Sequence, residues 1–200
     1  MMPPNSQELR VLGCLIEKQR TTPGAYPLSV NALRLACNQA TNRDPVVDWD
    51  ESTVRTAAQR LGERGWARFT SAAGSRAAKY RHVFDSALGL SPGDTALLAV
   101  LMLRGAQTPG ELKTRTDRMH GFGSLAEVQE TLEGLIGREL AAAQPRRPGQ
   151  KEQRYVQLLG DEEEPVDEPP TAAAPDAASL EERVARLEAE VAALREELGG

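Results

Sequence analysis

The chain repeats itself, and this internal duplication constrains its fold more than any other feature. Each copy opens with a helical apolar pattern, passes a Thr-Pro step, continues through two more helical stretches and ends in a hairpin-like segment. The copies are offset by 86 residues from Pro23 to Pro109 but by 75 from Tyr80 to Tyr155. The first copy therefore holds 11 extra residues, which we assign to the segment 38–52. A period of this length indicates a duplicated domain and not a solenoid.

Three helices followed by a two-stranded wing are predicted in each copy, and this is the order of a winged-helix domain. Leu9, Leu12 and Leu15 open the first copy at helical spacing, and Leu97 and Leu101 do so in the second. We expect helices over 6–20, 28–39 and 51–64, then over 91–105, 110–118 and 124–136. The hairpins are expected over 66–84 and 139–159.

Composition agrees with a helical fold. Aromatic residues make up 4% of the chain and hydrophobic residues 40%, so Ala and Leu carry most of the apolar content and favour helices. We therefore predict a mainly α protein with small β wings (α+β), built from two tandem winged-helix domains. The expected boundaries are 1–87 and 88–160, followed by a disordered acidic linker at 161–179 and a heptad helix at 180–198.

The sequence also bears on the compartment. No apolar run approaches the roughly 18–20 residues needed to span a bilayer, so we expect no transmembrane helix. The N-terminus, MMPPNSQELR, lacks the basic and apolar regions of a signal peptide. Two cysteines are too few for a disulfide framework or for a four-ligand metal site on their own. We expect a cytoplasmic protein with reduced thiols.

Three long stretches carry a family resemblance: LGCLIEKQRTTPGAYPLSVNALRLACNQATNRDPV, TPGELKTRTDRMHGF and PRRPGQKEQRY. They resemble the YceH-like family, bacterial proteins of uncharacterised function, over residues 6–159. The resemblance implies tandem winged-helix domains, in agreement with the repeat. It implies no established activity, substrate or catalytic residue.

The third helix of the first copy is the candidate DNA-reading element, because a winged helix usually inserts this helix into the major groove. A buried stripe at Val54, Ala58 and Leu61 would turn its polar side chains outward. Arg and Gln can pair with guanine and adenine edges, and basic wing residues suit phosphates. The candidate DNA contacts of this copy are Arg55, Thr56, Gln59, Arg60, Arg76, Lys79 and Arg81. The alternative is an ordinary solvated helix face, and the acids Asp48, Asp50 and Glu51 are expected to cap the helix.

The second copy differs in charge. Its third helix is expected to bury Leu125, Val128, Leu132 and either Leu135 or Ile136. The outward face then carries Glu127, Gln129, Glu130 and Glu133, which phosphates would repel. The basic residues of its wing are Arg146, Arg147, Lys151 and Arg154. Two interpretations stay open: the wing contacts DNA while the helix contacts a protein partner, or the wing is simply solvated.

The sequence gives little support for catalysis or for metal binding. Cys14 and Cys37 lie on predicted helix faces, where cysteine is most often a buried hydrophobe. His82 and His120 are the only histidines, and no common catalytic motif is present. We therefore expect no catalytic residue, no cofactor and no metal. The segment 38–45 is either a polar binding surface or a network of turns, and the latter is favoured.

The tail predicts a coiled coil. Its apolar positions step by 4, 3, 4, 3 and 4 residues along Leu180, Val184, Leu187, Val191, Leu194 and Leu198. Valine at a with leucine at d favours a parallel dimer. Arg183 would attract Glu188 of the partner helix, and Glu190 would attract Arg195. The alternative is an amphipathic helix that packs back on its own domain.

Charge divides the chain into two parts. Residues 1–160 carry 21 Lys and Arg against 16 Asp and Glu, while residues 161–200 carry 3 against 13. A basic body with an acidic tail is compatible with an anionic partner for the body. We expect a dimeric regulatory protein that binds double-stranded DNA, and no enzyme. The competing hypothesis is a protein-interaction scaffold that makes no DNA contact, because winged helices serve both roles.

Overall fold

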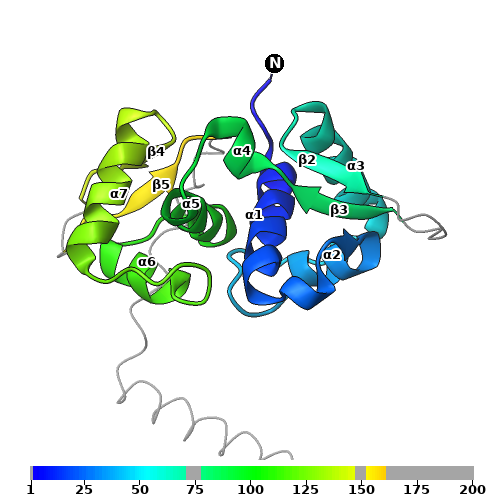
Figure 1. Cartoon of the computed structure of the whole chain (residues 1–200), viewed down its shortest axis with the longest axis horizontal. Helices are drawn as coiled ribbons and strands as arrows, with labels where there is room; N and C mark the ends of the chain where they lie inside the picture. Colours follow the sequence, from blue (N-terminus) through cyan, green and yellow to red (C-terminus); the bar gives the residue numbers. More distant parts are fainter. Residues whose placement is uncertain (1, 71–77, 147–151, 161–200) are drawn as a thin grey trace, which may run out of the picture. The chain divides into compact units, whose positions relative to one another are not determined.

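A computed structural model describes residues 2–70, 78–146 and 152–160 of the chain, which belong to one compact unit. These residues form a mixed α and β fold with seven α-helices and two small antiparallel sheets (Figure 1). The first half contains α1 (Ser6–Thr21), the 3-10 turn η1 (Pro23–Ala25), β1 (Leu28–Ser29), α2 (Val30–Cys37), α3 (Glu51–Glu63), β2 (Ala67–Thr70) and β3 (Lys79–His82). The short α4 (Phe84–Leu88) leads to α5 (Pro92–Arg104), α6 (Pro109–Thr116), α7 (Leu125–Gly137), β4 (Ala141–Ala143) and β5 (Tyr155–Gln157).

Local sequence explains where the helices begin. Asn5 caps α1 by accepting from the Glu8 amide at 2.9 Å, while the Glu8 carboxylate accepts from the Asn5 amide at 2.8 Å. Ser91 and Thr108 form the same reciprocal cap at α5 and α6, each followed by proline at the first helical position. These caps therefore fix the residue at which each of the three helices begins.

The first half closes with a three-stranded sheet in the order β1-β3-β2. Leu28 pairs with Tyr80, and Ala67 pairs with His82, both in antiparallel register. In the second half β4 pairs with β5, and a single bridge from Gln107 to Tyr155 lies where β1 lies in the first half. The two halves thus share one order of helices and strands.

Helix α5 lies at the centre of the core. Residues 97–103 are all at most 8% exposed, so this helix is covered on every side. It packs against α1, and α6, α7 and β5 contact it as well (Figure 1). The buried apolar residues of both halves form one continuous cluster.

Most predicted helices are confirmed to within a few residues, and the differences have local causes. The second helix begins at Val30 and not at Leu28, because Leu28 and Ser29 pair with β3 and the Ser29 hydroxyl caps α2. Leu125 was expected to be buried but is 45% exposed, since it occupies the first turn of α7 just after the Ser124 cap. Helix α4 was not predicted; Gly89 ends it with a φ of 61°.

Several expectations fall on residues outside the described ranges. They are the acidic linker 161–179, the heptad helix 180–198 and the wing residues Arg76, Arg147 and Lys151.

Candidate nucleic-acid interface

Helix α3 presents the face that its sequence predicts. Val54, Ala58 and Leu61 are fully buried, and Ala57 joins them. The candidate DNA contacts of this helix are all exposed: Arg55, Thr56, Gln59 and Arg60. Glu63 is exposed as well. The apolar stripe therefore fixes the rotation of α3, and the side chains able to pair with base edges lie on its solvent side.

The start of α3 is held in place by the segment between α2 and α3, which is longer than the connection between α6 and α7 in the second half. Asn38 at the end of α2 accepts from the Trp49 amide at 3.0 Å and donates to the Trp49 carbonyl at 2.8 Å. Asp50 then caps α3 by accepting from the Thr53 amide at 2.7 Å. Hydrogen bonds from the Thr53 backbone and side chain lower the pKa of Asp50, so it stays a capping carboxylate.

Three cations share one face of the three-stranded sheet. Arg68 on β2 pairs directly with Arg81 on β3, and Lys79 lies two residues from Arg81 on the same face. All three side chains are exposed. Within the described part of the chain no carboxylate lies within ion-pair distance of them. Like charges opposed across a strand pair are destabilising unless an anion lies between them.

An aromatic contact joins this sheet to α3. The rings of Phe69 and Tyr80 meet edge to face with centroids 5.2 Å apart. A Cβ atom at Gly62 of α3 would lie 2.8 Å from the Phe69 ring, so glycine allows the helix to approach the strand. The position of α3 relative to the cationic strands is thereby set by packing.

Arg68 is the site residue that sequence reasoning missed. The sequence predicts residues 66–70 as part of the hairpin 66–84 but assigns them no DNA contact. Alternation along β2 was the available signal, because Ala67 is buried and Arg68 must then point to the opposite face.

The second copy presents a different surface. Val128, Leu132 and Leu135 are buried as expected, while the outward residues are exposed: Glu127, Gln129, Glu130 and Glu133. Glu127 accepts from the Gly123 amide at 2.7 Å. Arg146 is exposed beyond β4. Helix α7 thus carries carboxylates where α3 carries guanidinium groups.

The segment 38–45 forms a network of turns around Arg43, which is 6% exposed while the other residues of the segment are partly or fully exposed. Arg43 donates to both carboxylate oxygens of Glu17, at 2.6 and 3.1 Å, and to Gln39 at 2.8 Å. The carbonyls of Ala36 and Asn42 accept its remaining donors. All five guanidinium donors are satisfied within the protein, so Arg43 is structural.

His82, Cys14 and Cys37 are buried in the structure. His82 is 3% exposed and its Nε2 lies 2.6 Å from Gln19 Oε1. Burial first, and then Arg20 and Arg81, lower the pKa of His82 to about 4 despite nearby Asp85. Both cysteines are buried free thiols. Across the described ranges no group of three or more His, Cys, Asp or Glu side chains is placed to hold a metal ion.

None of the helices in the described ranges is long and apolar enough to cross a bilayer.

Comparison with known proteins places the whole body in one family. A family described as "Protein of unknown function, DUF480" matches residues 5–150. A UPF0502 protein of Geotalea uraniireducens is 49% identical over 94% of this chain and 88% of its own length. A UPF0502 protein of Klebsiella pneumoniae is 46% identical over 96% of this chain and 93% of its own. The resemblance expected from the sequence is confirmed.

Proposed function

Because the chain belongs to the DUF480 family of proteins of unknown function, we propose its function from the geometry: it binds double-stranded DNA as a tandem winged-helix protein. Helix α3 enters the major groove, and the cationic strands β2 and β3 contact the flanking phosphates. The protein acts as a cytoplasmic regulator, and its heptad tail forms a homodimer.

The opposition of Arg68 and Arg81 is the observation that carries this proposal. Two guanidinium groups face each other across β2 and β3, and Lys79 adds a third positive charge on the same face. The free protein bears the cost of their repulsion. A phosphate backbone removes that cost, because each cation that replaces a condensed counterion adds to the affinity.

The order of elements supports the winged-helix interpretation. The β2–β3 hairpin follows α1, α2 and α3, with α3 immediately before it. Strand β1, which lies between α1 and α2, completes a three-stranded sheet in the order β1-β3-β2. In a helix-turn-helix domain this last helix reads base edges. The exposed Arg55, Gln59 and Arg60 supply the bidentate donors and acceptors that such reading requires.

A second candidate function, a protein-interaction scaffold, is favoured by the surface of α7. Leu125 is 45% exposed and Ile136 is 36% exposed, and their spacing of 11 residues places them on one helix face. The exposed Glu133 lies beside this face. Repulsion from phosphates excludes α7 from the DNA surface, so we assign it to a protein contact that accompanies DNA binding.

Fluorescence anisotropy with a short labelled duplex of mixed sequence tests the DNA proposal on the full chain. Arg55→Gln with Arg60→Gln should weaken binding by about tenfold or more, because two cations leave the groove face. Glu127→Gln with Glu130→Gln, on the matching helix of the second half, should leave the affinity unchanged or raise it. Equal losses from both double variants would contradict the assignment of α3. Absence of binding at low salt would leave the scaffold as the function.

A further inference from the structure

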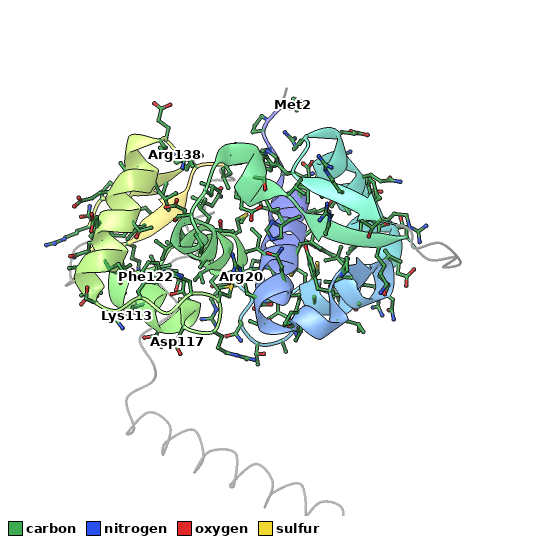
Figure 2. The ribbon with its side chains drawn as sticks, in the orientation of Figure 1. Met2, Arg20, Lys113, Asp117, Phe122 and Arg138 are labelled. Atoms are coloured by element: carbon green, nitrogen blue, oxygen red, sulfur yellow. The ribbon has the colours of Figure 1, made fainter. Side chains whose placement is uncertain are left out.

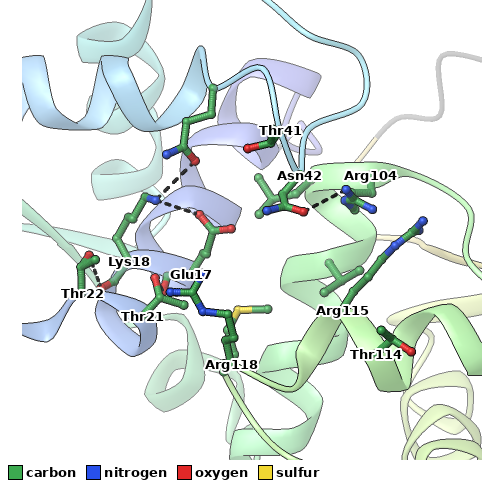
Figure 3. Close-up of a pocket in the computed structure, with 14 residues that line it drawn as sticks. Glu17, Lys18, Thr21, Thr22, Thr41, Asn42, Arg104, Thr114, Arg115 and Arg118 are labelled. Atoms are coloured by element: carbon green, nitrogen blue, oxygen red, sulfur yellow. Dashed lines mark hydrogen bonds and ion pairs between the residues drawn. The ribbon is translucent and has the colours of Figure 1, made fainter.

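A cleft of about 520 Å³ lies at the seam between the two halves of the described body (Figure 3). Its walls come from the end of α1, the loop after α2, the end of α5 and the end of α6. Both halves of the repeat therefore contribute to one cavity, which the proposed DNA surface does not use.

Positive charge dominates this cleft. Its cations are Lys18, Arg104, Arg115 and Arg118. The one carboxylate in its lining, Glu17, is held by buried Arg43 at 2.6 Å and by Lys18 at 3.4 Å. Within the described residues Arg118 has no ion-pair partner, and Figure 3 shows its side chain directed toward the α1 wall.

The pKa of Arg104 reflects the same excess of positive charge in the cleft. Its guanidinium donates to Asn42 at 3.0 Å, across the seam between the halves. Burial, followed by the charges of Arg115 and Arg43, lowers its pKa from the ordinary value. Neighbouring cations therefore destabilise the charged form, and a bound anion would reverse this effect.

The remaining lining includes apolar side chains as well as polar ones. Val100, Leu103 and Met119 supply apolar surface. The hydroxyls of Thr21 and Thr114 already donate to helix carbonyls, at 2.9 and 3.1 Å. Lys18 is paired with Glu17, and Arg115 with Glu111 at 3.6 Å, so Arg118 is the cation most available to a ligand. Thr41, Gln39 and Asn42 add neutral polar groups to the lining. The surplus of cations favours an anion over a neutral polyol.

We propose that this cleft binds a small organic phosphomonoester, of the size of a mononucleotide. A phosphate dianion satisfies several guanidinium forks at once, which a single carboxylate does not. The volume falls within the range of pockets that enclose small ligands, and the apolar wall receives the organic part. Because α1, α5 and α6 all line the cleft, the ligand links the two halves of the body.

Isothermal titration of the full chain tests this with AMP and ribose 5-phosphate as probes, and with adenosine and succinate as comparisons. A phosphomonoester should bind, adenosine should not, and succinate should bind more weakly. Arg118→Gln should weaken phosphomonoester binding by about tenfold, the effect of one lost charged hydrogen bond. Arg20→Gln removes the same charge from an exposed residue of α1 that does not line the cleft, and should change nothing.

Three outcomes would overturn the proposal. The first is that neither phosphomonoester binds. The second is that both arginine variants weaken binding equally, which would indicate a diffuse charge effect. The third is that succinate binds as tightly as AMP, which would reject phosphate recognition. None of these readouts involves DNA, so the cleft and the DNA surface are tested separately.

Discussion

Gly13 of α1 lies so close to Leu103 of α5 that a Cβ atom on the glycine would be 2.9 Å from the Leu103 Cγ and 3.4 Å from the Ala99 carbonyl oxygen. This approach is part of the packing of α1 against α5, in which the two halves of the body share one core. The absence of a side chain at Gly13 is therefore a condition for the way α1 and α5 pack.

Replacement of this glycine should destabilise the protein, although alanine is the better helix former. Gly13→Ala forces Leu103 or α5 to move, and such overpacking costs about 1–3 kcal/mol in the free energy of unfolding. Urea unfolding followed by circular dichroism measures the loss.

Gly134 in α7 provides the matched control. A Cβ atom there meets nothing within 4 Å. Gly134→Ala should therefore stabilise the protein by up to about 1 kcal/mol through helix propensity. If Gly13→Ala also stabilises the protein, the close packing of α1 on α5 is refuted.

Loss of Arg43 should unfold the segment that positions α3. Arg43→Leu leaves the Glu17 carboxylate, 14% exposed, without its closest partner and with only Lys18 at 3.4 Å. Breaking a buried pair in this way costs about 3–5 kcal/mol. Adding Glu17→Gln to Arg43→Leu should recover part of that loss, because the unpaired charge is gone. Chemical denaturation of the single and double variants makes the comparison, and a double variant no more stable than the single one would contradict the account.

Mild acid should destabilise the protein through His82. An unfolded imidazole takes up a proton near pH 6.5, whereas the buried one takes it up only near pH 4. Between these values the unfolded state binds more protons, so the free energy of unfolding falls as pH is lowered, by about 3 kcal/mol in total. His82→Gln should flatten this dependence between pH 6.5 and 4. A variant with the wild-type pH profile would assign the effect to other groups.

The tail should control self-association, and this prediction rests on sequence alone. Leu187→Asp places a charge at the central d position of the heptad and should shift the full chain toward the monomer. Ala189→Asp adds the same charge at an outward f position and should leave the dimer intact. Sedimentation equilibrium distinguishes the variants; a dimer that survives Leu187→Asp places the interface elsewhere in the chain.

Local patterns predicted much of this fold. The apolar periodicity of α1, α3 and α5 and the caps at Asp50 and Ser91 are properties of neighbouring residues, so they could be identified from the sequence. The strand β1 could not, because two residues become a strand only through pairing with β3, 50 residues later. Helix α4 could not be identified from the sequence either, because no side-chain cap marks its start.

Of the candidate sites, one could be predicted from local sequence and two could not. The exposed face of α3 followed from its buried stripe, and it was predicted correctly. The Arg68–Arg81 opposition depends on the register of two strands, and the cationic cleft depends on how the halves pack. Both are long-range properties, and charge counts along the sequence did not reveal them.

The salt dependence of DNA binding tests the central claim most directly. Arg68→Gln with Arg81→Gln removes two cations from the strand face, and Arg20→Gln with Lys113→Gln removes two from α1 and α6 (Arg20 and Lys113 are labelled in Figure 2). Anisotropy titrations across a salt series give the slope of log affinity against log salt concentration. We predict that the strand variant loses about two units of slope, since each phosphate contact contributes about 0.9, while the control variant keeps the wild-type slope. An unchanged slope in the strand variant, or an equal loss in both, would contradict the proposal that Arg68 and Arg81 bind phosphates.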